Sequence, residues 1–464
     1  MFFVLLTGVL GLAILTVLLW ARVRYSWLGT TARVIVLTLP FERIPSLSVG
    51  GSTLRFSQLA TLVGFYFLAI LLVRQDSETL RIRLGNLTWF LLGFLVLGIP
   101  SYFAVIDYAR FYVTFAGVLF AFGACWFVAH FAKNISTLLS ELVLVLFGCG
   151  LFAIYQVGAD LVGVPLSLTF LSVEYSKEVF GIARAQGTAL EPLYFAGMMF
   201  LPLMYGLFHI LAEAKPSPVV LPFFEKPARW FLNRPLLVFG FFAGILFLTY
   251  SKAALALAGL GVGVVLLQAL RRFSLKKIWA RFWPFTATGI GLVWAVFLYV
   301  ERARSVGGEL WTNLVDTLLG TSPSSTERLL YLQTGLDFLR KTPLLGIGSG
   351  QFGVVARAYL QARGLGLSRT QYLIVNNVYV EVWLEFGLFS ALVFYALLGF
   401  LLWRGLRRFW AYRFDRVPGP ELILTLTLCL YAGQWLTFSP IFIMPIFILL
   451  GLLYRTLTVQ EDIF

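Results

Sequence analysis

The chain has 464 residues, of which 59% are hydrophobic, 17% are aromatic and only 12% are charged, and its mean hydropathy is +0.87. Soluble globular proteins carry about twice this charged fraction, so the composition excludes an ordinary soluble protein. The formal net charge is +14. In a membrane protein such an excess indicates Lys and Arg retained on the cytoplasmic side, and it does not imply a nucleic-acid partner.

Long apolar runs predict an all-α polytopic membrane protein. They are far longer than the ~10 residues of a barrel strand and match the ~20 residues that a helix needs to cross the hydrocarbon. Runs of spanning length lie at residues 2–20, 57–73, 86–104, 110–131, 138–163, 190–213, 235–250, 253–270, 282–300, 373–403, 420–437 and 441–458. They predict about twelve transmembrane helices. A shorter apolar piece at 34–40 is either a thirteenth crossing or a re-entrant segment.

Basic loops orient the second half of the chain. The loops 271–281 and 404–416 are rich in Lys and Arg without acidic balance, so both should be cytoplasmic. A third basic stretch lies at 215–234. Because two crossings must separate it from the next cytoplasmic loop, the short break at 249–252 should be a tight turn on the outer face.

The same parity places residues 164–189 and the long hydrophilic stretch 301–372 on the outer side of the membrane. Loops longer than ~60 residues escape the charge rule, so the basic residues of 301–372 are compatible with this side. The predicted organisation is transmembrane helices over 1–300, a periplasmic loop with amphipathic helices over 301–372, and further transmembrane helices over 373–464.

Within this loop, the sequence predicts one helix and one turn. Ser324 and Glu327 are spaced as a capping box, and leucines recur at helical spacing at positions 329, 332, 336 and 339. This pattern predicts an amphipathic helix at the membrane surface. The glycine-rich segment 346–352 lacks the Lys and the preceding strand of a phosphate loop, so it predicts a turn that returns the chain to the membrane.

Three cations are predicted at the starts of outer helices. Arg184 lies shortly before a helix, Lys252 lies in the first turn of another, and Arg328 lies in the first turn of the loop helix. Positive charge is unfavourable at the positive end of a helix unless an anion binds there. Lys252 could instead be a snorkelling interfacial lysine, and Arg328 could pair with Glu327 on the surface. Together the three cations predict a site for a diphosphate or another polyanion.

Thr188 and Glu191 are spaced as a capping box for the helix that begins near Pro192, and a proline in the first helical turn needs no hydrogen bond there. This structural interpretation explains these three residues. It does not explain Arg184.

Two carboxylates follow at the start of the tenth apolar run. Glu381 and Glu385 are four residues apart and therefore share one helical face. Carboxylates inside a span need partners or a polar cavity. The pair is either satisfied by neighbouring helices or a bound cation, or it faces the cavity as a general base or a positioner of the acceptor hydroxyl. Asn376 and Asn377 just before them are either N-caps or sugar ligands.

Cysteine and histidine are too scattered to predict a disulfide framework or a metal site. They lie at Cys125, Cys149, Cys429, His130 and His209.

Four blocks of the sequence resemble the bacterial O-antigen ligase and O-antigen polymerase superfamily of membrane glycosyltransferases. They are Arg-x-x-Gly-Thr-x-x-Glu-Pro at 184–192, Thr-x-Ser-Lys at 249–252, the loop block 328–352, and Asn-x-Tyr-x-Glu-x-x-x-Glu-x-Gly at 377–387. The family more often has Arg where Lys252 stands. The resemblance covers roughly residues 140–405, and it is the order and spacing of the blocks that make it specific.

The resemblance implies a GT-C-like fold of about twelve helices with a large periplasmic loop, in the bacterial inner membrane. It implies transfer of a glycan from an undecaprenyl diphosphate carrier to the hydroxyl of a glycan acceptor, without a metal or other cofactor and with inversion, and a chain-length regulator as a further partner. The implied roles are diphosphate stabilisation by Arg184, Lys252 and Arg328, base catalysis by Glu191, Glu381 or Glu385, and hydrogen bonding by Tyr194 and Tyr379.

Ligases of this superfamily usually carry a His just before the motif asparagine, where this chain has Asn376. An amide cannot accept a proton, so this difference favours a polymerase that joins lipid-linked repeat units. A ligase that attaches the glycan to the lipid A core is the alternative. A flippase for lipid-linked oligosaccharides is an alternative from another class, because intramembrane carboxylates also mark transport sites. The missing internal repeat and the long outer loop count against it.

Overall fold

The computed structural model describes residues 27–42, 46–49, 52–73, 85–172, 183–189, 191–212, 225–276, 278–280, 283, 323–342, 344–363, 373–414, 416–438 and 444–459. The predicted span 2–20 lies outside these residues, as does 282–300 except for residue 283, and so do residues 301–322 and 364–372 of the predicted loop.

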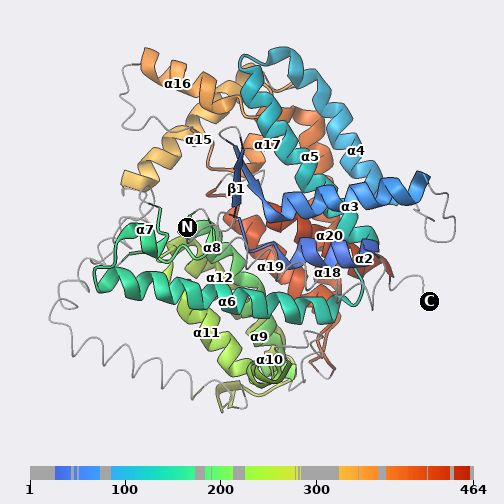
Figure 1. The fold of residues 1–464 in the computed structure, drawn as a ribbon, viewed down its shortest axis with the longest axis vertical. Coiled ribbons are helices and arrows are strands. Elements are labelled where there is room, and N and C mark those ends of the chain that lie inside the picture. The colour runs from blue at the N-terminus through green and yellow to red at the C-terminus, as the bar shows by residue number, and fades with distance from the viewer. Residues whose placement is uncertain are drawn as a thin grey trace.

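Helices make up nearly all of the described structure (Figure 1). In chain order the elements are α2 (Trp27–Leu37), β1 (Ser46–Val49), β2 (Ser52–Arg55), α3 (Phe56–Val73), α4 (Asn86–Gly98), η1 (Ile99–Ala104), α5 (Tyr108–Phe131), α6 (Ile135–Leu161), α7 (Leu166–Thr169), α8 (Pro192–Met198), α9 (Phe200–Ala212), α10 (Glu225–Leu232), α11 (Pro235–Leu248), α12 (Lys252–Leu270), α15 (Pro323–Lys341), α16 (Phe352–Ala362), α17 (Val378–Phe386), α18 (Leu388–Ala411), α19 (Pro420–Gln434) and α20 (Met444–Val459).

Six helical stretches of the described chain are long and apolar enough to cross a membrane. They are Asn86–Ala104, Tyr108–Phe131, Ile135–Leu161, Pro192–Ala212, Lys252–Leu270 and Leu388–Ala411. Shorter apolar helices also cover most of the 57–73, 235–250 and 441–458 runs. The protein is thus an integral membrane protein built from helices, as predicted, whereas this structure does not establish the number of spans.

The short apolar piece 34–40 forms the end of α2 and the turn after it. The residues Leu28–Val36 of α2 are all buried, so this helix lies inside the bundle rather than on its surface. After the turn, β1 and β2 form an antiparallel hairpin that pairs Ser46 with Arg55. The hairpin was not predicted, because four-residue strands of mixed polarity leave no periodic signal.

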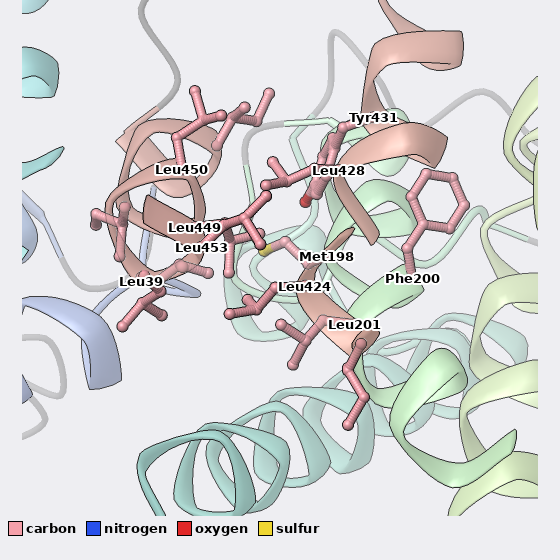
Figure 2. Close-up of a cluster of buried hydrophobic side chains, with 14 of the residues drawn as sticks. Leu39, Met198, Phe200, Leu201, Leu424, Leu428, Tyr431, Leu449, Leu450 and Leu453 are labelled. Carbon is pink, nitrogen blue, oxygen red and sulfur yellow. The ribbon is translucent and has the colours of Figure 1, made fainter. Parts of the chain in front are cut away.

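A hydrophobic core joins the N-terminal and C-terminal helices around α19. Figure 2 shows side chains from α8, α9, α19 and α20 meeting in it, together with Leu39 from the turn after α2. Met198 lies between leucines of α19 and α20 in this view, and Tyr431 lies at the same cluster. The core therefore holds the turn after α2 against the C-terminal helices.

The described part of the 301–372 loop consists of α15 and α16, which lie at one end of the long axis of the molecule, opposite α9, α10 and α11 (Figure 1). The loop helix is confirmed, but it begins at Pro323, so Ser324 lies inside it and is not its N-cap. The leucines of its predicted apolar face differ in burial. Leu339 is buried in a small second core with α16 and α17, whereas Leu329 and Leu336 are exposed.

The glycine-rich segment after α15 is a turn, as predicted, but it leads into α16 and not directly to the next span. Gly346 has φ of +78°, and a Cβ there would lie 2.6 Å from the backbone nitrogen of Gly387. Only glycine fits this close approach of two chain segments.

Candidate functional site

Three segments far apart in the sequence meet at the C-terminal end of α19 and the residues that follow it. The side chain of Gln434 donates a hydrogen bond to the carbonyl oxygen of Leu193, with Nε2 and O 3.0 Å apart. Asn377 Nδ2 donates to Leu436 O at 3.1 Å, and Arg328 Nη1 donates to Thr437 O at 3.5 Å. This end of α19 therefore brings the starts of α8 and α17 and the first turns of α15 together.

Arg184 is fixed against the turn between α11 and α12. Its Nε donates to Thr249 O at 2.9 Å, and the next residue, Ala185, donates its N–H to Leu248 O at 3.0 Å. Lys252 is the first residue of α12, three positions after Thr249, and its side chain is exposed. The predicted tight turn at 249–252 is thus present, and it brings Lys252 to the same region as Arg184.

Arg184, Glu191 and Arg328 interact electrostatically. Burial lowers the pKa of Arg184, the neighbouring charge of Arg328 lowers it further, and Glu191 opposes the change. Burial likewise lowers the pKa of Arg328, while Glu191 and Glu327 oppose it. The two arginines are therefore close enough to repel each other, and Glu191 is the carboxylate that compensates both.

The predicted capping box at Thr188 is wrong. Glu191 is itself the N-cap residue of α8, with φ of −130° and ψ of 153°, and no side chain caps this helix. Thr188 donates its hydroxyl hydrogen bond to Pro40 O instead, at 2.6 Å. Pro192 does lie in the first helical turn, as predicted. Thr188 therefore ties the loop that carries Arg184 to the turn after α2.

The predicted sugar ligands lie around the end of α19, and several have structural partners there. Asn377 is the N-cap of α17, since its Oδ1 accepts from Val380 N at 3.0 Å. Asn376 is half-buried and has φ of +60°. The hydroxyl of Tyr379 donates to Ala432 O at 2.9 Å. Tyr194 packs edge to face on Phe438, with ring centroids 4.5 Å apart.

A small pocket of mainly apolar lining lies beside these residues, between α8, α19 and the start of α20. Its lining residues are Tyr194, Met198, Tyr431, Gln434, Trp435, Phe438, Pro445 and Ile446. Tyr194 follows Glu191 by three positions, so the pocket adjoins the charged cluster.

The two carboxylates of α17 have different surroundings. The Glu385 carboxylate accepts hydrogen bonds from the backbone N–H groups of Gly350, at 2.8 Å, and Phe352, at 3.5 Å, and Arg110 is near enough to act on its charge. It therefore holds the glycine-rich turn against α17. Glu381 is 4% exposed and lies one turn nearer to Asn377.

Glu42 belongs to this region and was missed in the sequence. It is 5% exposed, and burial raises its pKa from the ordinary 4.5 to about 7; Arg55 opposes the rise and Glu191 adds to it. The available signal was an acidic residue two positions after the apolar piece 34–40.

Among the described residues, no group of three or more His, Cys, Asp or Glu side chains is placed to hold a metal ion. The charges that the described chain assembles at the end of α19 are instead cations and two carboxyl groups.

The fold and the site define a helical membrane protein in which two partly buried arginines lie near the end of α19 and the turn between α11 and α12. Residues 237–395 match the model of a family described as O-antigen ligase. This match over part of the chain supports the resemblance to the O-antigen ligase and O-antigen polymerase superfamily. A search of curated proteins found no match. The family match contains Lys252, Arg328 and α17, but it begins after Arg184, Glu191 and Glu42 and ends before α19.

Proposed function

We propose that the protein is a polymerase-type glycosyltransferase of O-antigen assembly. It transfers a glycan from undecaprenyl diphosphate to a sugar hydroxyl of another lipid-linked repeat unit, on the periplasmic face of the bacterial inner membrane. The reaction is metal-independent and inverts the anomeric carbon. The observation that carries this proposal is the cluster of Arg184, Arg328 and Glu191 beside the turn that begins α12.

Arg184 is prepared to bind an anion. Its Nε is held by Thr249 O, and its Nη groups make no hydrogen bond to any described residue. A guanidinium fixed in this way presents its remaining N–H donors as a fork that suits two phosphate oxygens. Arg328 is held by a single weak bond to Thr437 O within the described chain, so it too retains donors for the diphosphate.

Cleavage of the sugar–diphosphate bond develops negative charge on the leaving group. Cations fixed before the reaction stabilise that charge without reorganisation, and partial burial strengthens the interaction. Arg184, Arg328 and Lys252 supply this stabilisation. Before the donor binds, the negative charge of Glu191 compensates the two arginines. In the bound state the negative charge of the diphosphate compensates them.

The sugar-binding surface in this proposal comprises Asn376, Asn377, Tyr379 and Tyr194, around the end of α19. Glu191 and Glu381 are candidates to position or deprotonate the acceptor hydroxyl. For Glu385 we propose a positioning role, because backbone amides already engage its carboxylate.

The ligase is the second candidate, because the family that matches residues 237–395 is described as O-antigen ligase. Asn376 favours the polymerase. It stands where ligases of the superfamily carry a histidine, and its amide cannot take up a proton.

One experiment separates these functions. Purified protein in detergent is incubated with undecaprenyl-diphosphate glycan, with and without the lipid A core. A ladder of lipid-linked products of increasing length, formed without the core, is the expected result. A single core-linked product would assign the ligase activity instead. Because a detergent solution has no membrane gradient, any elongation also excludes a mere flippase.

A further inference from the structure

Glu42 is held in place from two sides. The N–H groups of Leu39 and Phe41 donate to Val36 O and Thr38 O, at 3.1 Å and 3.0 Å, so the chain after α2 continues as a tight turn. Thr188 binds the carbonyl oxygen of Pro40, and this bond joins the turn to the loop that leads to Glu191. Glu42 follows Pro40 by two positions, and Glu191 follows Thr188 by three. The two carboxyl groups are therefore brought together by fixed backbone.

The Glu42 carboxyl lacks a full set of hydrogen bonds. Its Oε1 atom is buried and has no hydrogen-bond partner among the described residues. An unpartnered buried acceptor destabilises the fold when it is purely structural, so its presence needs an explanation. The charged and titratable groups that act on Glu42 are Arg55 from β2, Glu191 at the start of α8 and Tyr431 from α19.

Glu191 connects Glu42 to the cations. Glu191 interacts with Glu42 and with both Arg184 and Arg328. The arginines favour the ionised form of Glu191, and the ionised Glu191 raises the proton affinity of Glu42. When a diphosphate occupies the arginines, its negative charge raises the proton affinity of both carboxyl groups further. A carboxylate that gains proton affinity as the donor binds suits base catalysis.

We propose that Glu42 is the general base that accepts the proton of the acceptor hydroxyl, an assignment that rests on the proposed glycosyl transfer. The hydroxyl oxygen forms a bond to the anomeric carbon, and the bond from that carbon to the diphosphate oxygen breaks. The electron pair of the broken bond remains on the diphosphate beside Arg184 and Arg328. The hydroxyl proton moves to the ionised Glu42, which becomes neutral. Glu42 then releases this proton to solvent before the next cycle.

This role explains two features that the cations do not. Asn376 leaves the chain without the histidine base of the ligases, and Glu42 supplies a proton acceptor from a different part of the fold. The orphan Oε1 of Glu42 becomes the atom that takes up the proton.

The test is Glu42→Gln, which keeps the size of the side chain and resembles the neutral carboxyl but cannot accept a proton. We expect the rate of lipid-linked elongation to fall by about 10²–10⁴-fold. Binding of undecaprenyl diphosphate should stay within about threefold of the parent protein, because the arginines are unchanged. The control is Glu421→Gln, at the opposite end of α19, because Glu421 is a partly buried carboxyl that also has an oxygen without a hydrogen-bond partner among the described residues. It should leave elongation unchanged.

The pH profile distinguishes a base from a structural residue. Since the pKa of Glu42 is about 7, only about one tenth of it is ionised at pH 6, and elongation by the parent protein should fall about tenfold per pH unit below 7. Glu42→Gln should lose this acidic limb, and Glu42→Asp should keep it at a reduced rate. An unchanged rate or an unchanged acidic limb in Glu42→Gln would overturn the assignment. If the parent protein itself transfers no glycan, the proposed function fails first.

Discussion

At the scale of single residues, Arg184 and Arg328 differ from ordinary surface arginines in being partly buried next to each other. The charge of Arg328 lowers the pKa of Arg184, Glu191 opposes the fall of the pKa at both arginines, and Glu327 opposes it at Arg328. A stable fold retains an arrangement of this kind where a ligand completes it. Arg184 precedes α8 by eight positions, and Arg328 lies in the second turn of α15 and not in its first turn, where the sequence predicts it.

The first prediction concerns these cations. Arg184→Ala and Arg328→Ala should each lower elongation by at least about 100-fold, because each removes a donor to the developing charge. Arg340→Ala is the control, since Arg340 lies on the same helix as Arg328 in an exposed pair with Asp337. Product ladders and thermal unfolding in detergent give the measurement. Near-normal elongation in either variant, in folded protein, would remove that arginine from the diphosphate site.

The second prediction concerns Thr188. Thr188→Val should lower the free energy of unfolding by about 1–3 kcal/mol, because it leaves Pro40 O without its 2.6 Å donor. It should also lower elongation, because the loop and the turn that carry Glu191 and Glu42 are no longer joined. Thr61→Val is the control, since the buried Thr61 hydroxyl only bonds to Ser57 O within α3. Equal stability of the two variants in thermal unfolding would refute the prediction.

At the scale of elements, the glycine-rich turn connects α15 to α16 and packs closely against α17. Backbone N–H groups of Ile347 and Gly348 donate to Leu384 O and Glu385 O, and the Glu385 carboxylate accepts from Gly350. The side chain of Gln351 binds both the N–H and the carbonyl oxygen of Asp107. The turn therefore fixes the described part of the outer loop to α17 and to the start of α5.

The third prediction tests the close packing of the glycine-rich turn against α17. Gly346→Ala should destabilise the protein by more than about 1–2 kcal/mol, because it adds a clash with Gly387 to the strain of a left-handed backbone. Gly399→Ala, in α18, has open space around the new methyl group and should be neutral or slightly stabilising. Melting temperatures of the two variants in the same detergent provide the comparison. A Gly346→Ala protein as stable as the parent would contradict this account of the turn.

At the scale of the whole molecule, α12 separates the candidate site from the basic loops. Lys252 begins this helix, and Arg271 and Arg272 follow its end. A helix of 19 residues is about 28 Å long, close to the thickness of the hydrocarbon. Arg272 binds Arg413 O at 2.7 Å, and Gln268 binds three carbonyl oxygens at the end of α18. Two of the basic loops thus lie together at the end of α12 remote from Arg184.

The fourth prediction follows from this separation. In a variant with the native cysteines replaced, a single cysteine at Lys252 should react with a membrane-impermeant maleimide added to the periplasmic side. A single cysteine at Arg413 should react only after the inner membrane is permeabilised. Labelling of both positions from the same side would refute the proposed orientation.

The sequence sufficed for features that depend on local spacing. Lys252 does begin a helix, and the turn at 249–252 followed from the length of the surrounding apolar run. The prediction that Arg328 lies in a first helical turn is wrong, because α15 begins five residues earlier, at Pro323. Glu385 could not be interpreted in the same way, because its partner is a backbone amide of Gly350 in a distant turn. Glu42 could not be found at all, since its burial and its neighbour Glu191 arise only from tertiary packing.

Several segments contribute side chains to the site at the end of α19, and this limits which parts of such enzymes can be exchanged in chimeras. The segment that matches the O-antigen ligase family carries Lys252 and Arg328, but the counter-charge Glu191 precedes it and the residues that anchor Arg328 and Asn377 follow it. Residues 237–395 are therefore not an autonomous module. A chimera that exchanged only this segment between relatives would transfer only part of the charge cluster. One that also carried residues 40–42, 183–191 and 420–438 would keep the cluster whole.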